Sequence, residues 1–261
     1  MQEATAYAEL YQEGKARMSK DGGISIMQGR AVGGSTLINW TSSFRTPPAT
    51  LEHWADKHEV SSLSEQTLKP WFERMEKRLG IEAWPIAANA NNEVIKRGCQ
   101  VLGYDWAVIP CNVRDCLSLG FCGMGCPASA SGKVELRSDG SPVLDYQMTD
   151  FTWQAMRRAY RSMAEIQFAA GAEKVFPVHN QADYMTSLAE TQRVIDGLDL
   201  AIHRARLGSA HVMGGCALSD NPKLGVTNSW GVHHQLENLS VDDGSVFPTS
   251  IGANPRYLFM Q

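Results

Sequence analysis

The stretch from His211 to Pro255 decides how this sequence is interpreted. It begins His211-Val-Met-Gly-Gly-Cys216, continues through Asp243-Gly-Ser245, and ends Gly252-Ala-Asn254-Pro255. It therefore combines an imidazole that can titrate near neutral pH, glycine-bearing turns, and a carboxamide next to a proline. Such a set can surround the reactive edge of a flat cofactor.

These residue types suit the removal of two electrons and a proton from an alcohol. A histidine, with an unperturbed pKa of about 6.5, can take the hydroxyl proton as a base. The hydride that leaves the adjacent carbon needs an acceptor that no side chain provides, so a cofactor is required. A lone histidine is more often structural than catalytic. The other histidines of the chain are interpreted as structural: His53, His58, His179, His203, His233 and His234.

A second glycine-bearing motif lies nearer the N-terminus and runs Gly29-Arg-x-x-Gly33-Gly34-Ser35-Thr36-x-x-Asn39. Two adjacent glycines permit positive φ and let the backbone approach a ligand without a Cβ in the way. The hydroxyls and backbone N–H groups that follow could face a phosphate or a ring carbonyl. Taken alone, this motif indicates no more than a turn.

Together the two motifs resemble, in order and spacing, those of the glucose–methanol–choline (GMC) family of flavoprotein oxidoreductases. The resemblance implies FAD as cofactor and oxidation of a small-molecule alcohol by hydride transfer to the flavin. It implies that His211 is the base and that Asn254 donates a hydrogen bond to the substrate oxygen. The electron acceptor stays open between oxygen, a quinone and a cytochrome. The residues implied to contact FAD are Gly33, Gly34, Ser35, Asn39, Asp243, Gly244, Ser245 and Pro255.

Four cysteines fall close together, at Cys111, Cys116, Cys122 and Cys126. Thiolates at such spacings could bind a metal or an iron–sulfur cluster, although none of the gaps is the two-residue gap of a zinc ribbon. The favoured interpretation is a cysteine-rich loop, reduced or partly disulfide-bonded. A similar Cys-x-x-Gly-Cys-Pro stretch occurs in GMC proteins that act on long-chain or bulky alcohols.

The expected fold is α/β (α+β): a partial FAD-binding domain and an antiparallel-sheet substrate-binding domain flanked by helices. Residues 1–50 are expected to form the flavin-covering segment of the FAD domain. Residues 51–205 would be mainly the substrate-binding domain, with the cysteine-rich loop at 111–127, and residues 206–261 the C-terminal catalytic segment at the flavin edge. Hydrophobic spacing, caps and turn residues predict helices over 3–19, 50–58, 70–79, 92–102, 150–170 and from 187, a strand over 24–27 and a hairpin over 134–146. Helix caps are expected at Thr50, Asp150 and Ser187, and a capping box from Ser62 to Glu65. Pro70 is expected to open a helix that ends at Gly80 and that places Trp71 and Phe72 in the core.

Parts of a GMC protein are missing from this sequence. Family members are longer and begin with a strand–turn–helix unit bearing Gly-x-Gly-x-x-Gly, which is not found here. A second gap falls near Ala130-Ser131. Two explanations stay open: a naturally shortened product, or segments of a longer chain joined together. Two alternative functions also stay open, a remnant or binding module that holds no flavin and a metal or iron–sulfur electron-transfer protein.

Composition and charge exclude several classes of partner. The 261 residues carry a formal net charge of −4, which gives no electrostatic reason to expect nucleic acid or an anionic membrane surface. No apolar run approaches the ~18 residues that a membrane-spanning helix needs. The N-terminus lacks the basic and apolar regions of a signal peptide. A cytoplasmic protein with no nucleic-acid partner and no membrane span is expected.

Overall fold

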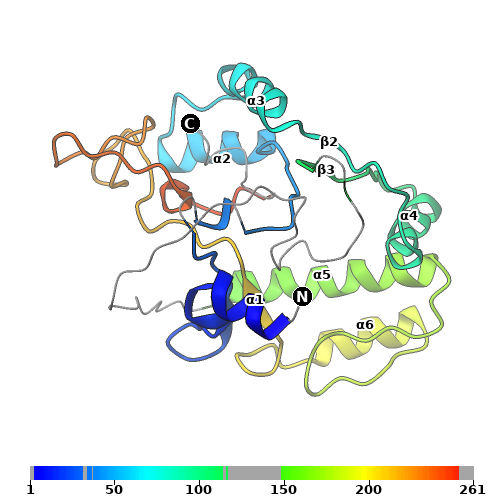
Figure 1. Ribbon diagram of the computed structural model, residues 1–261. Helices are drawn as coiled ribbons and strands as arrows, with labels where there is room; N and C mark the ends of the chain where they lie inside the picture. Colours follow the sequence, from blue (N-terminus) through cyan, green and yellow to red (C-terminus); the bar gives the residue numbers. More distant parts are fainter. Residues whose placement is uncertain (1–2, 32–33, 37, 114–115, 117–147, 253–261) are drawn as a thin grey trace.

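The computed structural model describes residues 3–31, 34–36, 38–113, 116 and 148–252 (Figure 1). It confirms the expected mixture of helices and strands. In the described part of the chain the helices are α1 (Glu3–Leu10), α2 (Pro48–His58), α3 (Glu65–Leu79), α4 (Ala90–Leu102), α5 (Asp150–Ala169) and α6 (Leu188–Gly197), and the strands are β1 (Ile24–Ile26), β2 (Glu82–Ala83), β3 (Pro110–Cys111) and β4 (Leu207–Ser209). Short 3₁₀ turns include η1 (Gln12–Lys15), η2 (Gly34–Thr36) and η4 (Gly244–Val246).

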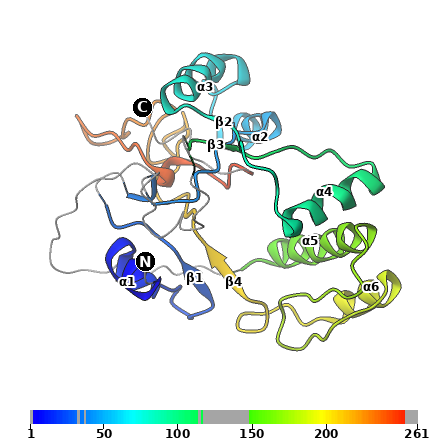
Figure 2. The same ribbon diagram turned by 45° about the vertical axis from the view of Figure 1, so that its right-hand side comes forward.

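The strands form two small sheets. β1 and β4 pair in parallel, with Ile24 opposite Leu207 and Ile26 opposite Ser209, and they lie side by side near the centre of Figure 2. β2 and β3 pair antiparallel, and residues 41–43 line the other side of β3 through a bridge between Ser42 and Cys111. The antiparallel hairpin predicted over 134–146 lies outside the described residues.

The main hydrophobic core joins α2 and α3 to the chain segment 218–251, which is distant in sequence. Trp54 is fully buried and its ring stacks on that of Phe247, with centroids 5.5 Å apart. The indole N–H of Trp54 donates to the hydroxyl of Thr249 at 2.8 Å. The other buried members of this cluster are Leu51, Val60, Leu68, Phe72, Leu218, Val246 and Ile251. Burial of these apolar side chains is the main force that holds the two segments together.

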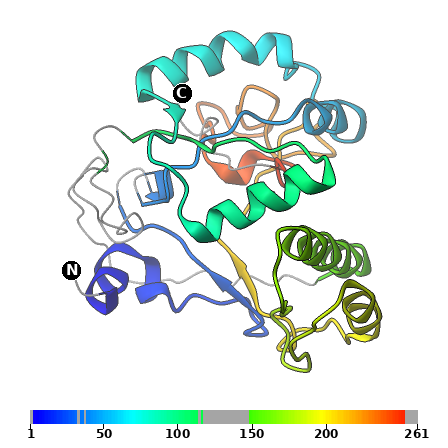
Figure 3. The ribbon, with the colours of Figure 1, turned by 90° about the vertical axis from the view of Figure 1, so that its right-hand side faces the viewer.

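α4, α5 and α6 form a separate helical layer in which α5 lies between the other two (Figure 3). Gly98 of α4 permits the close approach of α5, because a Cβ at this position would lie 2.1 Å from the backbone oxygen of Ile166. A small second core under α5 contains Ala164, Val175 and Met185. No helix in the described part of the chain is long and apolar enough to cross a membrane.

Two helix predictions were wrong in extent. The helix expected over 3–19 ends at Leu10, because Glu13 and Gly14 take left-handed φ values of 52° and 60° and break the helical hydrogen bonding. Pro70 was expected to open a helix, but it lies inside α3, whose capping box at Ser64 starts the helix earlier. The predicted helix end at Gly80 is confirmed, with Gly80 in the left-handed region.

Other errors concern caps and burial. Thr50 was expected to cap α2, but this helix begins at Pro48 and the Thr50 hydroxyl donates to the backbone oxygen of Ile251 at 3.0 Å. Thr149, not Asp150, caps α5. Trp71 was expected in the core and is 57% exposed, because its neighbour Phe72 occupies the inward position.

The predicted cap at Ser187 is confirmed, since its side chain accepts a hydrogen bond from the backbone N–H of Glu190. The predicted strand over 24–27 is observed as β1, Ile24–Ile26. The helix predicted over 92–102 begins slightly earlier, at Ala90, because the side chain of Asn89 caps it.

Candidate functional site

Both sequence motifs start from the same edge of the parallel sheet. β1 ends at Ile26 and leads into the Gly29 motif, while β4 ends at Ser209, shortly before His211. A hydrogen bond from the Met27 N–H to the Ser209 oxygen, 2.8 Å long, extends the pairing to the strand ends. Ligands of open α/β sheets bind outside the carboxyl ends of parallel strands. The two segments that are predicted to contact the flavin therefore begin at the edge of the sheet where such a ligand would bind.

The N-terminal motif is held by its own side chains. The hydroxyl oxygen of Ser35 accepts a hydrogen bond from the Gly29 N–H at 2.9 Å. The amide of Asn39 donates to the Ser35 backbone oxygen at 3.0 Å and accepts from the Thr41 N–H at 2.7 Å. Ser35 and Asn39, predicted to contact FAD, thus shape the segment. Gly33 lies outside the described residues.

Gly34 gives this motif an open backbone surface. Its φ of 54° lies in the left-handed region that favours glycine. A Cβ added at Gly34 would have no other atom within 4 Å. A flat ligand could therefore approach this backbone closely.

The C-terminal motif brings the residues that follow His211 against the Asp243 turn. The Cys216 N–H donates to the Ser245 oxygen at 2.9 Å, and the Leu218 N–H donates to the Val246 oxygen at 2.7 Å. His211 is an exposed residue, yet the protein atoms around its imidazole lower its pKa below the usual value of 6.5 by disfavouring the charged ring. The imidazole is accordingly neutral at neutral pH, the form a base requires.

The Asp243-Gly244-Ser245 turn is closed on itself. The carboxylate of Asp243 accepts hydrogen bonds from the Ser245 N–H, at 2.9 Å, and from the Ser245 hydroxyl. Gly244 begins the 3₁₀ turn η4. The predicted partners Asn254 and Pro255 lie outside the described residues, so the pairing of Asn254 with His211 stays a prediction.

The structure describes two of the four cysteines of the cysteine-rich loop. Cys111 is buried in β3 and Cys116 is half-buried, while Cys122 and Cys126 lie outside the described residues. Within the described ranges, no group of three or more His, Cys, Asp or Glu side chains could hold a metal ion. The metal hypothesis therefore gains no support from this part of the chain.

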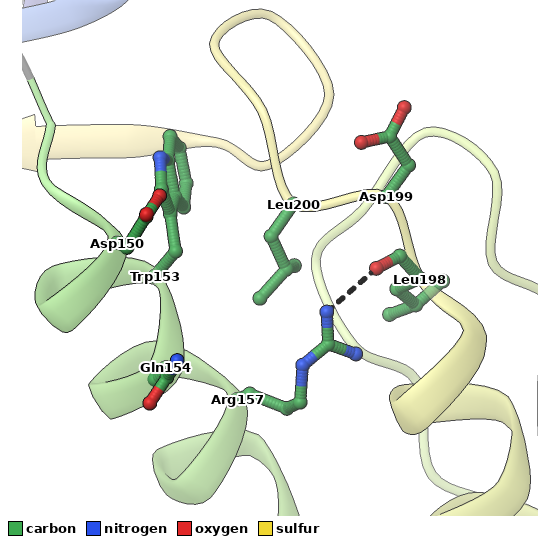
Figure 4. A pocket seen from close by; sticks show the side chains of 7 residues that line it. All are labelled: Asp150, Trp153, Gln154, Arg157, Leu198, Asp199 and Leu200. Carbon is green, nitrogen blue, oxygen red and sulfur yellow. Dashed lines mark hydrogen bonds between the residues drawn. The ribbon is translucent and has the colours of Figure 1, made fainter.

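A hollow of about 240 Å³ lies elsewhere, between the start of α5 and the segment after α6 (Figure 4). Arg157 crosses it and donates to the backbone oxygens of Asp196 and Leu198, each at 2.8 Å. Its guanidinium thus satisfies carbonyls at the end of α6. None of the predicted site residues lines this hollow. The residues that line it are Asp150, Trp153, Gln154, Arg157, Leu198, Asp199 and Leu200.

Three buried polar atoms near the N-terminal motif have no hydrogen-bond partner: Nε of Arg30, Oγ1 of Thr41 and Oδ1 of Asn112. Arg30 lies in the predicted N-terminal motif without an assigned role, and Thr41 and Asn112 were not singled out from the sequence. No local signal could have found Asn112, because its position beside Thr41 depends on pairing between segments far apart in the chain.

Comparisons with known proteins agree with these two motifs. Two family models, both described as GMC oxidoreductase, match the chain, the N-terminal one at residues 7–135 and the C-terminal one at residues 127–260. The chain is 27% identical over 204 residues to a long-chain-alcohol oxidase (FAO1) of Arabidopsis thaliana, covering 78% of this chain. It is 28% identical over 134 residues, 51% of the chain, to an uncharacterized GMC-type oxidoreductase (Rv0492c) of Mycobacterium tuberculosis.

This chain spans only part of its relatives. The matched regions cover 25% of the Arabidopsis oxidase and 21% of the Mycobacterium protein. No solved structure matches the chain.

Proposed function

The chain belongs to the GMC oxidoreductase family, and from that premise we propose that it contributes to FAD-dependent oxidation of an alcohol, with His211 as the base. The observation that carries this proposal is the start of both motifs at the carboxyl ends of the parallel strands β1 and β4. In that arrangement the segments that carry Gly34 and His211 both begin at the same edge of the sheet.

Two observations support the fit of a flavin to the residues present. The backbone at Gly34 has open space where a side chain would project, so a flat ring can lie against it. The buried Nε of Arg30, without a protein partner, is a donor that a ring or phosphate oxygen would satisfy. We propose that residues 1–50 and 206–261 frame the flavin and that residues 51–205 mainly bind the substrate.

When bound, FAD would supply the hydride acceptor. His211 would accept the hydroxyl proton at a ring nitrogen, which its lowered pKa leaves unprotonated at neutral pH. Asn254 would donate a hydrogen bond to the same substrate oxygen. Because the Arabidopsis relative is a long-chain-alcohol oxidase, a long-chain alcohol is the first substrate to test.

The test begins with flavin binding. The purified chain is titrated with FAD, and its absorption spectrum and intact mass are recorded. Flavin bands that remain after removal of free FAD would support the proposal. A chain that stays colourless after FAD has been added and free FAD removed would overturn the proposal. That result would favour a binding module that holds no flavin.

The second step replaces His211 with alanine. Turnover of a long-chain alcohol should fall by roughly 10²-fold or more while FAD stays bound, because proton removal loses its base. His53→Ala, a change at an exposed histidine of α2, is the matched control and should leave turnover unchanged. Unchanged turnover in the His211 variant would remove this residue from the mechanism.

The pH dependence of the unmodified chain gives a further check. A base is active when unprotonated, and desolvation lowers the pKa of His211 below 6.5. Activity should therefore fall as the pH decreases, with the midpoint of the fall below pH 6.5. A midpoint above pH 6.5 would contradict this assignment.

A further inference from the structure

Thr41 and Asn112 occupy opposite positions where two distant segments pair. The antiparallel bridge between Ser42 and Cys111 sets the register, so the preceding residue, Thr41, faces the following residue, Asn112. The Asn112 N–H donates to the Thr41 backbone oxygen at 3.2 Å. The two residues are therefore neighbours across the pairing, and their Oγ1 and Oδ1 atoms are not hydrogen-bonded to each other.

Both side chains leave a buried polar atom without a partner. Thr41 is only 4% exposed, and its Oγ1 makes no hydrogen bond; Oδ1 of Asn112 is likewise buried and unpaired. A buried polar group without a partner destabilises a protein, because it has lost its hydrogen bonds to water. Two such atoms at opposite positions supply a hydroxyl donor and a carbonyl acceptor that nothing in the described chain uses.

The backbone at Thr41 is also held in an unusual conformation. Its φ is 65°, a value that a β-branched residue rarely adopts. Two neighbours fix it: Asn39 accepts from the Thr41 N–H, and the Ser43 hydroxyl donates to the Thr41 oxygen at 2.9 Å. Backbone strain of this kind persists where the surroundings over-determine the position and is concentrated at functional sites.

We propose that Thr41 and Asn112 form a subsite that binds the imide edge of the flavin ring. This edge carries an N–H group flanked by two carbonyls. The Asn112 carbonyl would accept from the imide N–H, and the Thr41 hydroxyl would donate to a neighbouring carbonyl. The flavin is favoured over the alcohol because Asn39 ties Thr41 directly to the Ser35 segment. This inference rests on the proposed function.

In this arrangement Asn39 is a positioning residue. Its amide group is engaged with the backbone at Ser35 and Thr41, and so it sets the conformation that presents the Thr41 hydroxyl. A trapped water that joins Thr41 to Asn112 is the competing explanation. The two explanations differ in what they predict for the protein without flavin.

The first experiment measures flavin affinity and apoprotein stability in matched variants. Thr41→Val and Asn112→Leu each remove one hydrogen-bonding group with little change of volume. Each should weaken binding of both FAD and riboflavin by about 3- to 10-fold, the effect of one lost hydrogen bond. Thr46→Val is the control, because Oγ1 of Thr46 is also buried and unpaired but Thr46 is not opposite Asn112. The control should bind flavin as tightly as the unmodified chain.

The melting temperature of the apoprotein separates a ligand site from a structural water. If the Thr41 hydroxyl awaits a ligand, Thr41→Val should leave the melting temperature unchanged or raise it, because an unsatisfied group is removed. A lower melting temperature in Thr41→Val would identify a structural hydrogen bond and overturn the proposal.

A modified ligand tests the contact directly. Riboflavin methylated on the imide nitrogen has lost the N–H donor, so the unmodified chain should bind it about 3- to 10-fold more weakly than riboflavin. Asn112→Leu should bind the two ligands equally. Equal binding of both ligands by the unmodified chain, or unchanged affinity in both variants, would overturn the subsite alone. An unmodified chain that binds neither FAD nor riboflavin would overturn the proposed function as well.

Discussion

Two regions of this molecule differ in how far their buried polar groups are hydrogen-bonded. The first is the closing interface, defined as the contact of residues 48–72 with residues 218–251. There the indole N–H of Trp54, the hydroxyl of Thr50 and the carboxylate of Asp220 are all hydrogen-bonded across the interface. Among the described residues of this interface, Oγ of Ser62 is the one buried side-chain polar atom without a partner. The second is the motif segment, residues 29–43 with Asn112, where several buried polar atoms have no partner.

The difference indicates how stability and binding are divided. Satisfied hydrogen bonds and stacked rings in the closing interface stabilise the fold. Unpaired buried atoms in the motif segment reduce stability, and under the proposed subsite a bound flavin would satisfy those of Thr41 and Asn112. Changes to the closing interface should therefore lower stability, whereas polar deletions in the motif segment should lower flavin affinity instead.

The largest loss of stability should come from Phe247→Ala. This change removes the ring that stacks on Trp54 in the main core, and truncations of buried phenylalanine typically lower the free energy of unfolding by about 3–5 kcal/mol. Urea denaturation followed by tryptophan fluorescence measures it. Trp71→Ala, at an exposed aromatic of α3, is the control and should change stability by less than about 1 kcal/mol. Equal losses in the two variants would mean that the closing interface is not the main core.

A smaller loss is expected for Asp220→Asn. The carboxylate of Asp220 accepts hydrogen bonds from the N–H and hydroxyl groups of both Ser61 and Ser229, and so joins the two sides of the closing interface. After allowance for solvent screening of this exposed residue, the change should destabilise by roughly 1–2 kcal/mol near neutral pH. Asp56→Asn, at an exposed position of α2, should have no measurable effect.

The effect at Asp220 should depend on pH. Burial alone would raise the pKa of Asp220, but hydrogen bonds from Ser229 and Ser61 lower it from 3.8 to about 2. A lowered pKa means that the stabilisation is complete above pH 3.8 and is lost as the pH falls through about 2. The stability difference between the two proteins should therefore shrink over that window. A difference that stays constant down to pH 2 would show that the charge of Asp220 is not its cause.

The sequence predicted the motifs better than it predicted their surroundings. Glycine and histidine spacing located the segments after β1 and β4, because close backbone approach needs particular residues at particular positions. Both aromatic residues at the centre of α3 were predicted to lie in the core, which is right for the buried Phe72 and wrong for the exposed Trp71. The roles of Thr41 and Asn112 could not be predicted at all, since an unpaired atom is defined by what the whole fold places around it.

The smallest expected effect distinguishes two serines that precede α3. Sequence spacing favoured a capping box from Ser62 to Glu65, but Ser64 caps the helix and accepts from the Thr67 N–H at 3.1 Å, whereas Oγ of Ser62 is buried without a partner. Ser64→Ala should therefore destabilise by about 1 kcal/mol, the usual loss for an N-cap. Ser62→Ala should be neutral or stabilising, because it removes an unsatisfied hydroxyl. If thermal unfolding ranked the two variants in the opposite order, unpaired atoms could not be taken as a guide to binding sites, and the contrast between the closing interface and the motif segment would lose its basis.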